Sequence, residues 1–214
     1  MTDSDFLTST RAFYDTIAED YAERFRDELT ATPIERGLID AFAALVGKGA
    51  AVADLGCGPG RVTAYLDSLG LSVFGLDLST SMLAIARREN PGLRFEQGSM
   101  LDLDLADGSL AGVVSWYSSI HTPVERLPTL FAEFRRVLAP GGHLLLAFQV
   151  GDEPKRHDRP FGHDVILDFQ RRRPEAIVEL LEAAGFAMVS RTVREPDHEW
   201  ESTKQAFLIA RRPA

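Results

Sequence analysis

The sequence predicts an α/β protein built on a doubly wound, mostly parallel sheet. Three observations favour this fold class. The chain has 214 residues, of which 45% are hydrophobic, and this is enough to bury one substantial core. Strand and helix patterns alternate from about residue 50 to residue 150. An apolar strand at 50–55 runs directly into a glycine-rich turn and a helix, which is the local order of a ligand-binding βα unit.

The elements are expected in the following order. Two amphipathic helices at 4–29 and 33–46 precede the core, and they have room to act as a cap. Core strands are expected at 50–55, 71–76, 93–97, 111–116 and 143–150, with helices at 61–69, 79–89 and 124–138 between them. The segment 151–162 contains Pro154, Pro160 and many charges, so it is expected to be an irregular excursion beyond the sheet edge. A helix at 174–184 ends before Gly185, a favourable C-cap residue, and strands at 186–194 and 204–211 follow.

The most informative stretch is Asp54-Leu-Gly-Cys-Gly-Pro-Gly60. Its glycines lack the β-carbons that would keep the main chain away from a ligand, and they tolerate positive φ angles in a tight turn. The dinucleotide fingerprint G-x-G-x-x-G requires a third glycine where this chain has Arg61. A second acid, Asp77, ends the next strand, where a carboxylate can accept hydrogen bonds from ribose hydroxyls. Both features indicate a ligand that carries ribose.

These residues resemble class I S-adenosylmethionine-dependent methyltransferases over most of the chain. The first motif at 54–60, the acid in Gly75-Leu-Asp77-Leu-Ser79, the turn Gly98-Ser-Met100 and the run Val137-Leu-Ala-Pro-Gly-Gly142 before a strand follow the family's order. The resemblance implies a seven-stranded, Rossmann-like sheet with an antiparallel last strand. It also implies a helical cap at 1–47, a cofactor-binding core at 48–214 and a substrate-side excursion at about 151–173.

The resemblance implies S-adenosylmethionine as the cofactor and assigns its contacts. The loop 56–60 would lie against the methionine part, Asp77 would hold the ribose, Leu78 would pack on adenine, and Ser99, or else Asp102, would meet the adenine amino group. A structural alternative makes Asp77 an N-cap, but Ser79 is the better cap. The full expected set is Asp54, Gly56, Cys57, Gly58, Gly60, Asp77, Leu78, Ser99, Met100, Ser115, Trp116 and Tyr21. Cys57 is expected to act as a small filler and not as a nucleophile.

Methyl transfer needs alignment of the acceptor, exclusion of water and, for a hydroxyl or amine, a proton acceptor. The cluster Ser115-Trp-Tyr-Ser-Ser-Ile-His121 ends the fourth strand, where an acceptor should sit. His121 is our candidate general base because a neutral imidazole accepts a proton near neutral pH; a capping or packing role stays open. The candidate acceptor contacts are Tyr14, Tyr117, His121, Phe148, Gln149, Phe161, His163 and Phe169, with Trp200 also considered. Core packing, or helix docking for the tyrosines, is the competing interpretation.

Composition narrows the remaining function classes. The formal net charge of −9 makes nucleic acid an unexpected partner. A single cysteine rules out an intramolecular disulfide, and the histidine spacing matches no metal site, so no metal is expected. We find no apolar run that could cross a membrane and no signal sequence at the start, so a soluble, cytoplasmic protein is expected. The sequence leaves a homodimer open.

The sequence therefore predicts a methyltransferase that transfers a methyl group from S-adenosylmethionine to a small-molecule acceptor, with oxygen as the first choice of acceptor atom. Two alternatives remain. A non-catalytic cofactor-binding protein would keep the same binding residues. A nicotinamide-dependent oxidoreductase would share the glycine turn and the acid, but Arg61 and the absence of a Tyr-x-x-x-Lys pair disfavour it.

Overall fold

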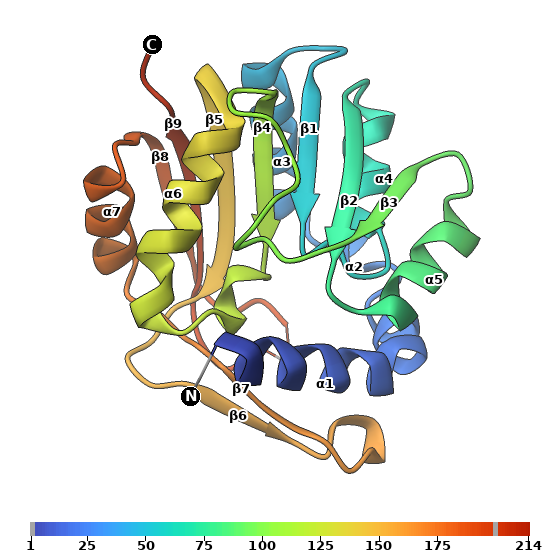
Figure 1. The fold of residues 1–214 in the computed structure, drawn as a ribbon. Coiled ribbons are helices and arrows are strands. Elements are labelled where there is room, and N and C mark those ends of the chain that lie inside the picture. The colour runs from blue at the N-terminus through green and yellow to red at the C-terminus, as the bar shows by residue number, and fades with distance from the viewer. Residues whose placement is uncertain (1–2, 199–200) are drawn as a thin grey trace.

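A seven-stranded sheet forms the centre of the computed structural model, which describes residues 3–198 and 201–214 (Figure 1). The strands are β1 (Ala51–Leu55), β2 (Ser72–Asp77), β3 (Arg94–Gln97), β4 (Leu110–Trp116), β5 (Leu138–Gln149), β8 (Ala187–Arg194) and β9 (Gln205–Arg211). Their order is β3-β2-β1-β4-β5-β9-β8. The first five strands are parallel, and β9 runs antiparallel to both of its neighbours. The expected doubly wound sheet with an antiparallel last strand is confirmed.

Helices cover both faces of the sheet (Figure 1). On one face lie α3 (Pro33–Val46), α4 (Arg61–Ser68) and α5 (Thr80–Glu89), and on the other lie α6 (Leu127–Val137) and α7 (Pro174–Ala183). The alternation of side chains along β1 builds both halves of the core: Val52 packs with α3 and α4, whereas Ala53 and Leu55 pack with α6. Burial on both faces explains why the parallel strands read as continuous apolar runs.

The carboxyl edge of the sheet is covered by segments from both ends of the core. Helix α1 (Asp3–Arg24) crosses this edge, and a hairpin of β6 (Lys155–Asp158) and β7 (Ile166–Phe169) lies beside it (Figure 1). The expected helix at 4–29 is divided, because a turn separates α1 from the short α2 (Glu28–Ala31). Arg61 binds this turn, since its Nη1 donates to the carbonyl oxygen of Phe25 and to the carboxylate of Glu28.

The segment 151–162 leaves the seven-stranded sheet as expected, but the expectation that it is irregular was wrong. Residues 155–158 pair with residues 166–169 as an antiparallel hairpin, and Arg156 forms a bidentate cross-strand pair with Asp168. The charged sequence Lys-Arg-His-Asp has no alternation of apolar and polar residues that would indicate a strand. It is extended because it pairs with the strand at 166–169. Three short 3₁₀ turns lie at Ser119–His121, Val124–Arg126 and Pro160–Gly162.

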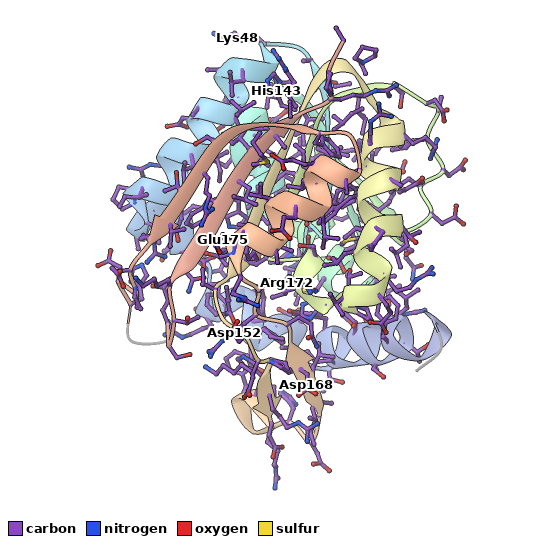
Figure 2. All side chains as sticks on the ribbon, turned by 90° about the vertical axis from the view of Figure 1, so that its left-hand side faces the viewer. Lys48, His143, Asp152, Asp168, Arg172 and Glu175 are labelled. Carbon is purple, nitrogen blue, oxygen red and sulfur yellow. The ribbon has the colours of Figure 1, made fainter. Side chains whose placement is uncertain are left out.

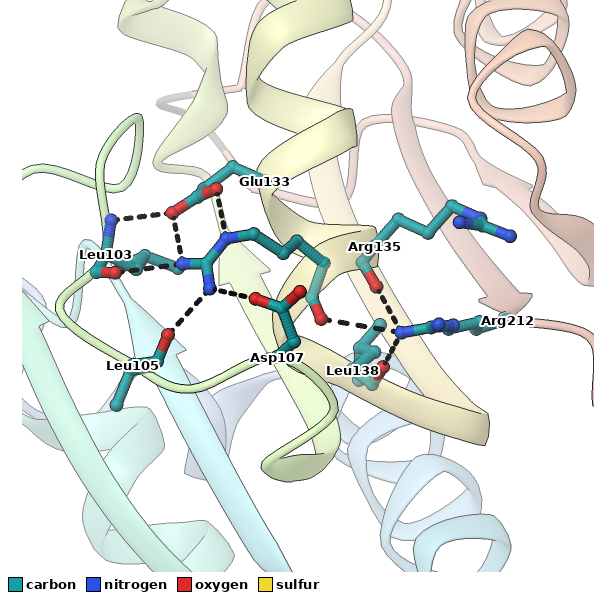
Figure 3. Close-up of polar contacts among 8 residues, drawn as sticks. Leu103, Leu105, Asp107, Glu133, Arg135, Leu138 and Arg212 are labelled. Atoms are coloured by element: carbon teal, nitrogen blue, oxygen red, sulfur yellow. Dashed lines mark hydrogen bonds and ion pairs between the residues drawn. The ribbon is translucent and has the colours of Figure 1, made fainter.

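Two arginines fix the C-terminal end of α6 (Figure 3). Arg136 donates to the carbonyl oxygens of Leu103 and Leu105 and pairs with Asp107 and Glu133. Arg212 donates through Nη1 to three carbonyl oxygens at the end of the helix, those of Arg135, Arg136 and Leu138. A positive side chain satisfies the free carbonyls of a helix C-terminus and complements the helix dipole. These contacts hold the loop before β4 and the final segment of the chain against α6.

We expect Arg136→Ala to lower the free energy of unfolding by about 2 kcal/mol, because it removes hydrogen bonds from a charged group and leaves the Glu133 carboxylate without its main cation. Urea denaturation measures this change. Arg135→Ala is the matched control, because the Arg135 guanidinium makes no hydrogen bond to the residues that the structure describes. An equal loss of stability in both variants would contradict the assignment.

Candidate functional site

A cavity lies at the carboxyl ends of β1, β2 and β4, beneath α1. It holds about 950 Å³ of space free of atoms, its open mouth included, which is a common size for a small-molecule site. Thirteen of the predicted site residues line it: Tyr14, Tyr21, Asp54, Gly56, Cys57, Gly58, Asp77, Leu78, Ser99, Met100, Trp116, Tyr117 and His121. Residues from α1 and from the ends of β1, β2, β3 and β4 therefore meet in one place.

The glycine loop after β1 is held by main-chain contacts on both sides. The amides of Gly56 and Cys57 both donate to the carbonyl oxygen of Leu76, at 2.7 and 3.1 Å. Gly56 has a φ of 76°, and a β-carbon on it would lie 2.2 Å from the Cβ of Ser118. Ser118 itself donates to the carbonyl oxygen of Leu55 at 2.5 Å. The backbone of Gly56 in the turn after β1 thus packs directly against the Ser118 side chain in the turn after β4, and only glycine permits this contact.

Asp54 is a buried acid at the start of this loop. Its Oδ2 accepts a hydrogen bond of 2.7 Å from Thr63, but its Oδ1 has no partner among the described residues. Burial raises the pKa of the Asp54 carboxyl to about 7, although the Thr63 hydroxyl opposes the shift. A buried oxygen without a partner is costly. A cation or hydrogen-bond donor in the cavity would satisfy it.

Asp77 brings a second carboxylate to the cavity. Its Oδ2 accepts from the amide of Gly58 and its Oδ1 from the amide of Ser79, both at 2.8 Å. Burial raises the Asp77 pKa, and these amides act against the rise. Ser79 is the N-cap of α5, since its hydroxyl accepts from the amide of Met82. Each oxygen of Asp77 has lone-pair capacity left for a ligand that carries hydroxyl groups.

Helix α1 closes the cavity from above. Asp15 accepts hydrogen bonds from the Ser79 hydroxyl at 2.7 Å and the Ser81 amide at 3.0 Å, and Glu19 pairs with Arg88 of α5. The stripe Tyr14 and Tyr21 faces the cavity as expected. Four further residues of α1 line the cavity but were not predicted from the sequence: Phe6, Leu7, Thr10 and Arg11. Positions 7, 10, 14 and 21 repeat at intervals of three, four and seven residues, so helical spacing could have revealed them.

Tyr14 and His121 meet at the other end of the cavity. The Tyr14 hydroxyl lies 2.9 Å from His121 Nε2, and His121 Nδ1 has no partner among the described residues. Burial lowers the pKa of His121 to about 3, and the nearby His157 and Arg172 add to the shift. Tyr117, beside them, has a φ of 53°, which is uncommon for a residue with a bulky side chain. Strained residues of this kind cluster at functional sites.

Seven predicted residues do not line the cavity. Gly60 packs on Phe95 as the N-cap of α4, and Ser115 bonds with Ser118 below the cavity floor. The others are Phe148 in the hydrophobic core, Gln149 at the end of β5, Phe161 exposed on the hairpin, His163 paired with Asp20 of α1, and Phe169 packed edge-on against His121. Asp102 is exposed and lies outside the lining. Trp200 lies outside the residues that the structure describes.

In comparison with known families, residues 52–142 match the model of a family described as a methyltransferase domain. Malonyl-[acyl-carrier protein] O-methyltransferase of Pectobacterium atrosepticum is 36% identical over 100 residues, covering 46% of this chain and 38% of that protein. Trans-aconitate 2-methyltransferase of Methylobacterium nodulans is 39% identical over 108 residues, covering 48% and 39%. The chain thus matches less than half the length of these relatives.

Solved structures share the whole fold. The DhpI–S-adenosylhomocysteine complex superposes with a TM-score of 0.77 at 23% identity and covers 99% of both chains. The 1,6-didemethyltoxoflavin-N1-methyltransferase of Burkholderia thailandensis, with 1,6-didemethyltoxoflavin and S-adenosylhomocysteine bound, gives 0.75 at 21% identity, covering 100% of this chain and 92% of that one. These likenesses confirm the expected Rossmann-like fold. Within residues 3–198 and 201–214, no helix is long and apolar enough to cross a membrane.

The contact between Gly56 and Ser118 yields a first prediction for this site. Gly56→Ala should lower the free energy of unfolding by about 3 kcal/mol, because a β-carbon overlaps Ser118 and the residue must keep a left-handed φ. Gly58→Ala is the control, since its φ is also positive but nothing lies within 4 Å of the added carbon; it should cost about 1 kcal/mol. Urea denaturation of both variants measures the difference, and equal losses would refute the steric explanation.

The raised pKa of Asp54 predicts a pH effect on stability. An acid whose folded pKa lies above its unfolded value stabilises the fold at low pH, and this contribution is lost as pH rises through the folded pKa, here from about 4 to about 7. Asp54→Asn keeps a neutral side chain at every pH. At pH 8 we therefore expect the variant to be more stable than the parent by roughly 4 kcal/mol, which corresponds to a shift of about three pKa units, and at pH 4 nearly equal to it. Thermal unfolding across this pH range provides the measurement, and a constant difference would contradict the shift.

Proposed function

Because the chain carries a methyltransferase domain on the class I fold, we propose that it is an S-adenosylmethionine-dependent methyltransferase that acts on a small molecule, with oxygen as the acceptor atom. When bound, S-adenosylmethionine supplies a methyl group on a positively charged sulfur. The residues of this chain would bind that compound, orient the acceptor and exclude water.

The observation that carries the proposal is the unpartnered Oδ1 of Asp54 in a cavity that also contains Asp77. A ligand that carries both an ammonium group and a ribose diol fits these two acids, because an ammonium donates to carboxylates and a diol offers two hydroxyl donors. S-adenosylmethionine has both groups. The two carboxylates of the cavity therefore fit the cofactor.

The remaining cofactor contacts follow from the same cavity. Gly56 and Gly58 leave the loop backbone open, and no atom lies within 4 Å of the place that a β-carbon on Gly58 would occupy. Leu78, Ser99 and Met100 line the part of the cavity next to Asp77, where an adenine ring would pack. Tyr21 would cover the cofactor from α1. We include Cys57 and Trp116 among the contacts on the same ground.

The acceptor is proposed to lie between Tyr14, Trp116, Tyr117 and His121. The aromatic faces of this group suit a cationic sulfur and exclude water. Two curated relatives are named as an O-methyltransferase acting on malonyl-[acyl-carrier protein] and as a methyltransferase acting on trans-aconitate, which supports oxygen as the acceptor atom. Residues 1–47 would act as the cap, and the hairpin would cover the acceptor side of the cavity. The space beneath them suits a small molecule.

Calorimetric titration with S-adenosylmethionine and S-adenosylhomocysteine tests the proposal directly. We expect binding of both, and we expect Asp54→Asn and Asp77→Ala to weaken it by roughly 10- to 100-fold, the worth of a hydrogen bond to a charged group. Asp102→Asn is the control, since Asp102 is exposed outside the cavity, and should bind within about twofold of the parent. Absence of binding at millimolar ligand would overturn the proposal.

The pH dependence gives a second readout of the same experiment. The free Asp54 carboxyl, with its pKa of about 7, must lose a proton to pair with the ligand's ammonium group. Affinity should therefore fall by up to about tenfold per pH unit below 7 in the parent and stay flat in Asp54→Asn. A parent affinity that does not change between pH 5 and pH 7 would show that Asp54 does not meet the ammonium group.

A further inference from the structure

Among the residues that the structure describes, the titratable side chains that act on the His121 imidazole are basic. His121 ends the 3₁₀ turn Ser119–His121 after β4, and the edge of Phe169 packs on its ring, with centroids 4.8 Å apart. Behind Phe169, the His157 ring of β6 stacks at 4.0 Å. Within residues 3–198 and 201–214, no carboxylate hydrogen-bonds to the imidazole. His121 therefore lacks the acidic partner that would stabilise an imidazolium.

Arg172 is the second charged group behind this turn. It follows β7 on the way to α7 (Figure 2), and it is only 8% exposed. Its Nη2 donates to the carbonyl oxygens of Ser119 and Thr122, and its Nε has no partner among the described residues. No carboxylate within those residues pairs with it, and burial lowers its pKa to about 10. A buried guanidinium without a counter-ion is costly, and it opposes any further positive charge nearby.

Tyr14 determines which nitrogen of His121 carries the proton. Burial raises the Tyr14 pKa well above 10, so the phenol keeps its proton. The hydroxyl lies 2.9 Å from Nε2. A phenol is the stronger donor and an imidazole nitrogen the stronger acceptor, so the hydrogen bond runs from Tyr14 to Nε2. A neutral imidazole then has its single proton on Nδ1, an assignment made from the hydrogen-bond network.

The consequence is a buried N–H donor on a residue of the cavity wall. Nδ1 has no acceptor among the described residues, and an unsatisfied buried donor costs about 1–3 kcal/mol. A ligand oxygen would satisfy it. An oxygen that already carries negative charge would also be stabilised by the nearby guanidinium of Arg172.

Building on the function proposed above, we propose that the acceptor is a carboxylic acid that binds as its carboxylate, and that His121 holds it by donating from Nδ1 and does not act as a base. The carboxylate oxygen forms a bond to the methyl carbon while the carbon–sulfur bond breaks. Its electron pair stays on sulfur, and the negative and positive charges cancel. The products are a methyl ester and a neutral thioether, and no proton is released.

A hydroxyl acceptor fits this site poorly. Its methylation releases a proton that some group must accept. On His121 that proton would create an imidazolium beside Arg172 with no carboxylate in contact, in the environment that lowers the imidazole pKa to about 3. The general base role expected from the sequence is thereby replaced by a binding role for the same residue.

The tautomer and charge of His121 can be read without any acceptor. In ¹⁵N-histidine NMR spectra of the protein loaded with S-adenosylhomocysteine, His121→Asn identifies the His121 signals by their absence. We expect a neutral ring with the proton on Nδ1 throughout pH 5–9. A proton on Nε2, or titration of the ring between pH 5 and pH 8, would overturn the proposal. Loss of S-adenosylhomocysteine binding by calorimetry would instead signal failure of the proposed function.

Turnover assays test the acceptor class. Formation of S-adenosylhomocysteine is followed with mono-, di- and tricarboxylic acids and with the matching primary alcohols. We expect methylation of acids only. With the best acid, His121→Asn should retain activity within about tenfold, because the asparagine amide presents an N–H at the Nδ1 position, whereas His121→Ala should lose about 100-fold or more. Methylation of alcohols alone, no methylation of any acid although the cofactor binds, or equal losses in both variants would refute the proposal.

Discussion

The direct contact between the turn after β1 and the turn after β4 is the constraint on which the rest of the site depends. Gly56 leaves no space for a β-carbon against Ser118, and Ser118 in turn bonds to the carbonyl oxygen of Leu55. This contact sets the distance between the glycine loop, with Asp54 at its start, and the turn that carries His121. The proposed cofactor end and the proposed acceptor end of the cavity are therefore built on one junction of two parallel strands.

Helix α1 completes the site, and polar contacts hold it there. Asp15 bonds to the N-terminus of α5, and Asp20 contacts His163 on the hairpin. An acid at a helix N-terminus complements the dipole and the free amides of that helix. The same helix supplies Tyr14 and Tyr21 to the cavity. Docking of α1 thus covers the proposed cofactor site and places the Tyr14 hydroxyl against His121.

The two ends of the cavity have opposite electrostatic character. At one end, burial holds Asp54 partly protonated near neutral pH, so the acid gains from a cationic ligand group. At the other end, burial and Arg172 hold His121 neutral, so this end gains from an anionic group. This is the basis of the proposal that the cavity takes one cationic and one anionic ligand, whose charges would cancel when a methyl group passes from sulfonium to carboxylate.

The sequence by itself determined the doubly wound sheet, the glycine loop and the two acids, because each rests on local patterns: strand and helix periodicity, glycines at fixed spacing, and acids that end parallel strands at a common edge. Only the tertiary structure decided the rest. Whether Phe148 packs in the core or lines the cavity depends on the face to which a strand end turns. The charged segment at 155–158 forms a strand only through its pairing with 166–169. The contact between Tyr14 and His121 joins residues that are 107 positions apart. Such contacts arise from packing between distant segments, on which local preferences carry no information.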